Sequence, residues 1–169
     1  MKTLKLILIF FSCFNIFSQE MYSEIISSIN DNKDRYQDTA MSIWDLAELG
    51  YQEYESSEIL QILLEDEGFF IEKGVAEIPT AFIASYGSGS PEIAILGEYD
   101  ALPGLSQKST PYKISNNGKA GHACGHHLFG TASAAAAIAL KNFLVKSKKS
   151  GTIKFFGCPA EEGGSGKVY

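Results

Sequence analysis

The apolar positions of the chain follow two patterns, which predict helices first and then strands. Residues 21–64 carry apolar side chains at a spacing close to the helical period, with a break at Gly50 and Tyr51. An alanine-rich stretch over 128–145 predicts a further helix. Short apolar runs bounded by Gly, Pro and Ser predict strands at 69–71, 81–84, 92–97 and 152–157.

The order of the last elements determines the expected fold class. A strand over 92–97, a helix over 128–145 and a strand over 152–157 form a β-α-β crossover, which implies parallel strands. Within 92–97, residues 93–96 form a continuous apolar run, as is typical of a strand covered on both faces. The chain is therefore expected to be α/β, with a mostly parallel sheet flanked by helices.

The polar segments that follow these strands indicate where a ligand would bind. Glu98 to Asp100 follow one strand, Cys158 to Glu162 follow the other, and a long polar loop over 98–121 leads to the helix. The carboxyl ends of parallel strands meet at one edge of a sheet, where open α/β folds have their ligand crevice. These segments are expected to converge there.

The first residues predict export. Lys2 and Lys5 precede an apolar segment over 6–17 that is too short to span a bilayer, and the small residue Ser18 follows. This pattern predicts a signal peptide over 1–18 and a mature protein over 19–169, periplasmic or secreted, with no stable membrane anchor. A membrane anchor and a lipid-modified Cys13 are the alternatives.

The net charge and the cysteine content limit the binding partners and the cysteine chemistry expected of the chain. The net charge of −6 argues against nucleic acid and against anionic membranes. Removal of residues 1–18 would leave Cys124 and Cys158, which could pair as a disulfide in an oxidising compartment. The alternative is a Cys124 thiolate held by a metal, which would resist that pairing.

All three histidines of the chain lie within residues 122–127, together with Cys124. Imidazole and thiolate are ligands that zinc prefers, with manganese as the alternative when carboxylates join them. Gly125 can adopt backbone angles that turn Cys124 and His126 inward. Alone, this stretch is compatible with a structural metal site, a redox thiol or a histidine cluster without a ligand.

Glu161 and Glu162 follow the last strand and add two carboxylates. Adjacent side chains diverge, so one could bind a metal while the other takes a proton from water and returns it to a leaving amine. Together with Cys124 and His126, they would give two or three ligands. A solvated glutamate pair is the alternative interpretation.

Three motifs, at residues 97–104, 122–126 and 159–164, resemble the amidohydrolase branch of the aminoacylase/carboxypeptidase-G-like metallopeptidases. That branch includes N-acyl amino acid amidohydrolases, auxin-conjugate hydrolases and aminobenzoyl-glutamate hydrolases, and the resemblance covers about 38–169. It implies a zinc-peptidase-like catalytic domain with two ions, zinc or manganese. The implied reaction is hydrolysis of N-acyl or N-aroyl amino acids, such as aminobenzoyl-glutamate, or of small dipeptide-like substrates.

The resemblance also implies roles for individual residues. Cys124, His126 and Glu162 would be metal ligands and Glu161 the general base. Asp100 matches an aspartate that orients a ligand, and Glu98 stands in the place of a histidine ligand.

His122 and His127 are further candidate site residues, either supporting the metal ligands or contacting the substrate. His127 stands where relatives carry Asp or Asn, and could be an extra ligand, a hydrogen-bond donor to a ligand or a tolerated change.

The family pattern contains further histidine ligands and a dimerisation domain that residues 19–169 do not include. The resemblance therefore implies an N-terminal part of a longer protein, a homodimer or hetero-oligomer through the additional domain, and no activity of this chain alone. Strand Thr152–Gly157 is expected to have an unpaired edge. The competing functional hypothesis is a non-catalytic metal- or ligand-binding fragment.

Overall fold

The computed structural model describes residues 22–114 and 118–169, so the expected signal peptide and Cys13 lie outside the described residues. Residues 22–31 are helical. The named elements, in chain order, are α2 Lys33–Leu46, α3 Tyr54–Asp66, β1 Phe70–Lys73, the short helix η1 Val75–Glu77, β2 Phe82–Ser88, β3 Glu92–Glu98, β4 Leu102–Pro103, β5 Ala120–Gly121, α4 His126–Ser147, β6 Gly151–Cys158, α5 Glu161–Gly164 and η2 Gly166–Val168.

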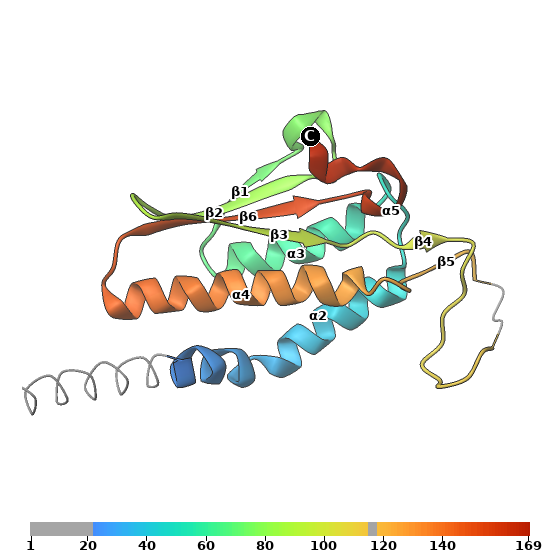
Figure 1. The fold of residues 1–169 in the computed structure, drawn as a ribbon, viewed down its shortest axis with the longest axis horizontal. Coiled ribbons are helices and arrows are strands. Elements are labelled where there is room, and N and C mark those ends of the chain that lie inside the picture. The colour runs from blue at the N-terminus through green and yellow to red at the C-terminus, as the bar shows by residue number, and fades with distance from the viewer. Residues whose placement is uncertain (1–21, 115–117) are drawn as a thin grey trace, which may run out of the picture.

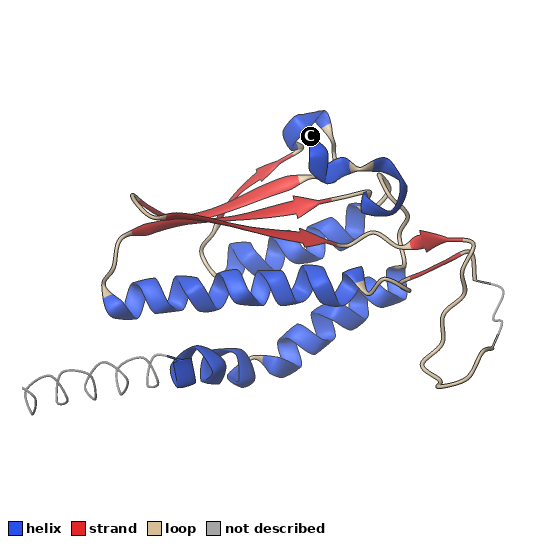
Figure 2. Ribbon diagram, viewed as in Figure 1, coloured by secondary structure: helices blue, strands red, loops and turns tan. Residues whose placement is uncertain are grey.

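Helices and sheet form layers (Figure 1). The four-stranded sheet has the order β1-β2-β6-β3. Helices α3 and α4 pack on one of its faces, and α2 packs on those two helices. The three long helices α2, α3 and α4 thus lie on the same side of the sheet (Figure 2).

Alternation along the strands explains which face is covered. Phe155 of β6 is fully buried, as are Phe82 and Ala84 of β2, and these side chains meet Leu60 of α3 and Ala134 of α4 in the core. The long apolar helix α4 is therefore the central core helix of this layer.

The mixed α/β class and the parallel pair β3–β6 are confirmed, but the expectation of a mostly parallel sheet is wrong in detail. The pairs β1–β2 and β2–β6 are antiparallel. The cause is the turn over 89–91, which reverses the chain between β2 and β3. Since the α4 crossover makes β6 parallel to β3, β6 must run antiparallel to its other neighbour, β2.

The expectation of an unpaired edge on the strand at Thr152–Gly157 is also wrong. β6 pairs with β2 on one side and with β3 on the other. Among the described residues, β1 and β3 are the edge strands, and in β3 Ile93 and Leu96 are 40% and 45% exposed. The apolar run over 92–97, expected to be covered on both faces, is thus only partly covered.

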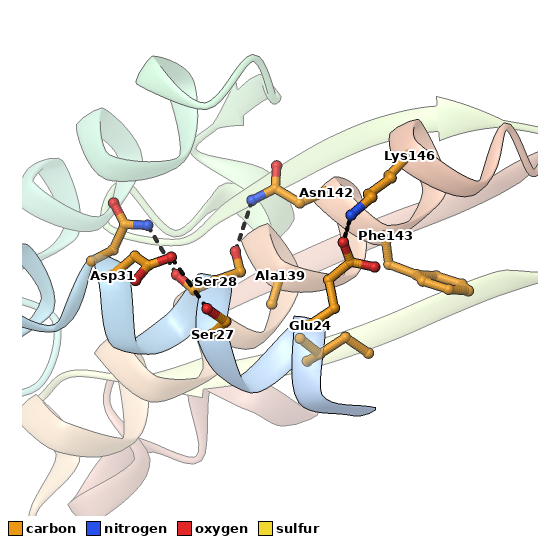
Figure 3. A pocket seen from close by; sticks show the side chains of 10 residues that line it. Glu24, Ser27, Ser28, Asp31, Ala139, Asn142, Phe143 and Lys146 are labelled. Carbon is orange, nitrogen blue, oxygen red and sulfur yellow. Dashed lines mark hydrogen bonds and ion pairs between the residues drawn. The ribbon is translucent and has the colours of Figure 1, made fainter. Parts of the chain in front are cut away.

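The helical residues 22–31 lie against the C-terminal half of α4. Asn142 Nδ2 donates a hydrogen bond to Ser28 Oγ at 3.2 Å, and Lys146 pairs with Glu24. Figure 3 shows these contacts around a small cavity of about 330 Å³. They fasten the N-terminal helical segment to the outer side of α4.

Close approach of α4 to β3 requires Gly130. A Cβ atom there would lie 2.5 Å from the carbonyl oxygen of Glu98 and 3.1 Å from Leu60 Cδ1. The absence of a side chain lets the first turns of α4 lie directly under the end of β3, where the polar segments begin.

Gly130→Ala is expected to lower the free energy of unfolding by about 1–3 kcal/mol, because the methyl group would push α4 away from β3. Urea denaturation measures this loss. Gly163→Ala is the matched control, since a Cβ at Gly163 meets no atom within 4 Å. Equal stability of the two variants would contradict the close-packing argument.

Candidate metal centre

The predicted convergence at one sheet edge is present. Asp100 follows β3, His126 is the first residue of α4, and Glu161 and Glu162 open α5 directly after β6 (Figure 1). Gly125 precedes α4 with a φ of 79°, a left-handed conformation that turns the chain into the helix. The special backbone conformation expected of this glycine is present, and His126 is buried while Cys124 is exposed.

Asp100 connects two of these elements. Its Oδ1 accepts a hydrogen bond from His126 Nδ1 at 2.9 Å, and its Oδ2 accepts one from the backbone N–H of Glu162 at 2.9 Å. Burial raises the pKa of this carboxyl, but the bonds from His126 and Glu162 outweigh it and leave the pKa lowered. An ionised Asp100 therefore fixes the start of α4 relative to the start of α5.

The same bond determines which nitrogen of His126 is free. Because Nδ1 donates to Asp100, Nε2 is the nitrogen that could bind a metal in place of a proton, as in carboxylate–histidine–metal arrangements. Nε2 lies 3.1 Å from Glu98 Oε2 and 3.9 Å from Glu161 Oε2. The hydrogen bond that His126 donates to Asp100 raises the pKa of His126, and the charges of Asp100 and Glu98 add to this effect, which outweighs burial.

Two groups of side chains could hold a metal ion. One is Cys124, His126 and Glu162, and the other is Glu98, His126 and Glu161; within each group the ligand atoms lie within 4.8 Å of one another. The three expected ligands are thus brought together. Both groups share His126, whose ring has one free nitrogen, so the imidazole can complete only one group at a time.

Cys124 is an exposed free thiol, and Cys158 is a buried free thiol, so the alternative of a disulfide is not what the structure shows. A hydrogen bond with Glu162, aided by neighbouring carboxylates, raises the pKa of Cys124. Burial raises the pKa of Cys158 to about 11. Little thiolate forms at neutral pH without a cation, which argues against a redox thiol.

His122 and His127 lie outside both groups. Their rings lie at a tilt of 48° with centroids 5.0 Å apart, and His122 Nε2 donates to the carbonyl of Ile43 at 3.1 Å. Nδ1 of each ring is buried without a protein partner. Burial lowers the pKa of both, and with the neighbouring imidazoles it lowers that of His127 to about 4. Both rings are therefore neutral at physiological pH.

Two residues that support the site were not found by sequence reasoning. Glu53 is fully buried, and its carboxylate accepts bonds from the Thr80 hydroxyl at 3.1 Å and from the N–H of Ala160 at 2.7 Å. It thereby anchors the residue that precedes the glutamate pair. Lys167 of η2 donates to Glu98 at 2.8 Å and to Glu161 at 2.9 Å.

The chain is similar in sequence to known proteins. Residues 94–169 match the model of peptidase family M20/M25/M40. The chain is 49% identical over 154 residues to one subunit of the p-aminobenzoyl-glutamate hydrolase of Escherichia coli, an alignment of 89% of this chain and 32% of that protein. The chain thus spans about a third of the length of this relative.

Solved structures share the fold. A crystal structure of a dinuclear metal binding peptidase of the M20 family from Bacillus subtilis has a TM-score of 0.54 at 29% identity, over 76% of this chain and 36% of that one. Another crystal structure, from methicillin-resistant Staphylococcus aureus, has a TM-score of 0.67 at 23% identity, over 83% of this chain and 35% of that one. This second similarity shows the fold alone.

Because His127 is buried in its neutral form, the stability of the fold is expected to depend on pH. Its folded-state pKa of about 4 lies below the ordinary 6.5, so the unfolded chain binds a proton more readily between these values. The free energy of unfolding should therefore fall by roughly 1–3 kcal/mol as the pH drops from 6.5 to 4.

Urea denaturation of the metal-free protein across this pH window tests the effect, with His127→Asn as the comparison. The variant should lose less stability on acidification than the wild type. Parallel curves for the two proteins would show that His127 titrates normally.

Proposed function

We propose that this chain, whose residues 94–169 belong to peptidase family M20/M25/M40, is part of a metal-dependent amidohydrolase. The proposed reaction of the whole protein is hydrolysis of the amide bond in N-acyl or N-aroyl amino acids, such as aminobenzoyl-glutamate. The observation that carries the proposal is the gathering of Cys124, His126 and Glu162 beside Glu161 at one sheet edge.

The donor set fits a divalent cation. A thiol, an imidazole with one nitrogen free and several carboxylates are the ligands of zinc, with manganese as the alternative. When bound, such an ion supplies polarisation of the amide carbonyl and acidification of a water molecule. Similarity to a dinuclear metal binding peptidase supports a centre of two ions in the whole protein.

Glu161 is the proposed general base. It begins α5, directly after the central strand β6, and the buried Glu53 holds the preceding residue, Ala160, by its N–H. Its Oε2 lies 3.9 Å from His126 Nε2, so the carboxylate borders the place where the ligands meet. From there it can take a proton from water and deliver it to the leaving amine.

A competing hypothesis is a non-catalytic metal- or ligand-binding fragment. It has one observation in its favour. The free nitrogen of His126 can serve only one of the two ligand groups, and a catalytic zinc needs about three protein ligands. Further ligands from the remainder of the whole protein would remove this shortage.

The proposal extends to the assembly of the whole protein and to its location. The Escherichia coli relative is one subunit of its hydrolase, which supports an oligomer, either a homodimer or a hetero-oligomer. The apolar segment over 6–17 after Lys2 and Lys5 supports export. Residues 1–18 would then be removed, and residues 19–169 would belong to the mature protein.

Export makes a direct prediction. The protein isolated from the periplasm or the medium should begin at Gln19 or close to it, because the small residue Ser18 ends the apolar segment. N-terminal sequencing measures this. A cytosolic protein that still begins at Met1 would refute export.

Glu161→Gln in the whole protein is expected to reduce hydrolysis of aminobenzoyl-glutamate by at least about 100-fold, because the amide cannot accept the proton. The variant should keep its metal, whereas Cys124→Ala should lose part of it. Turnover with and without a chelator, together with elemental analysis, tests both statements and distinguishes zinc from manganese. Full activity after chelation would favour a reaction without metal.

A further inference from the structure

Lys167 places a cation inside the second group of potential ligands. Its Nζ lies 2.8 Å from Glu98 Oε1 and 2.9 Å from Glu161 Oε1. The other oxygens of the same carboxylates face His126 Nε2, at 3.1 Å and 3.9 Å. Each glutamate therefore has one oxygen on the ammonium and the other toward the free imidazole nitrogen.

This arrangement satisfies the carboxylates without a metal. Glu98 is buried, with a side chain only 10% exposed, so an unpaired charge there would be costly. The Lys167 side chain is 38% exposed and is carried by the short helix η2. Its flexible four-carbon stem can swing the ammonium into water, whereas the glutamates are held by β3 and α5.

We propose that Lys167 is a built-in counter-ion of Glu98 and Glu161 that a divalent cation must displace. The inference rests on the metal centre of the proposed function and adds a competitor for one of its two ligand groups. An ammonium and a divalent cation on the same two carboxylates would repel each other at close range. Occupation by Lys167 and occupation by an ion are therefore mutually exclusive.

The proposal assigns different properties to the two ligand groups. Glu98 and Glu161 bind the ammonium of Lys167. None of the described interactions of Lys167 involves Cys124 or Glu162. An ion at Cys124 and Glu162 binds without competition from the chain. An ion at Glu98 and Glu161 binds more weakly than its ligands alone would allow, and its arrival frees Lys167.

Lys167→Met tests the competition, measured by calorimetric titration of the metal-free whole protein with zinc and, separately, with manganese. The variant should bind the ion at Glu98 and Glu161 roughly five- to tenfold more tightly, since the two partly exposed ion pairs of Lys167 no longer oppose it. Lys154→Met is the matched control. It removes a lysine that pairs with Glu92 at 2.8 Å, away from the site, and should bind like the wild type.

A second measurement follows the displaced ammonium in the wild type. Acylation of Lys167 by an amine reagent, quantified by mass spectrometry relative to Lys154, should rise several-fold when zinc is added. Unchanged labelling, or equal affinity of wild type and Lys167→Met, would overturn the displacement while leaving the proposed function in place. Failure of every protein to bind either metal would overturn both.

Discussion

The site depends on the two hydrogen bonds that Asp100 accepts. One comes from His126 at the start of α4, the other from the backbone of Glu162 in α5. A buried carboxylate is stable as an anion only when such donors surround it, so its charge keeps both elements in place. Glu53 acts in the same way nearby, because its buried carboxylate accepts a hydrogen bond from the N–H of Ala160.

Sequence reasoning recovered those parts of the fold and site that depend on local pattern and on order along the chain. The helical period, the apolar runs and the crossover between β3 and β6 led to the parallel pair and to the sheet edge where Cys124, His126 and Glu162 meet. It failed on the overall strand directions. Gly and Pro residues over 87–91 indicate a turn in the sequence, but periodicity does not reveal that β6 lies between β2 and β3.

The supporting residues could not be found in the same way, because their partners are distant in sequence. Glu53 and Ala160 are 107 positions apart, and Lys167 and Glu98 are 69 apart. A glutamate before a helix and a lysine among glycines look like solvated side chains in the sequence. Only the three-dimensional arrangement distinguishes a buried anchor or an internal cation from an ordinary surface charge.

The position of β3 at the edge of the sheet has a consequence for local stability. β6 is bonded to strands on both sides, whereas β3 has one strand partner among the described residues. Edge strands open at lower free energy than central ones, so amide hydrogen exchange should be faster in β3 than in β6. Such an opening would carry Asp100 away from His126 and Glu162, and the site would come apart while the strand that leads to the glutamates stayed folded.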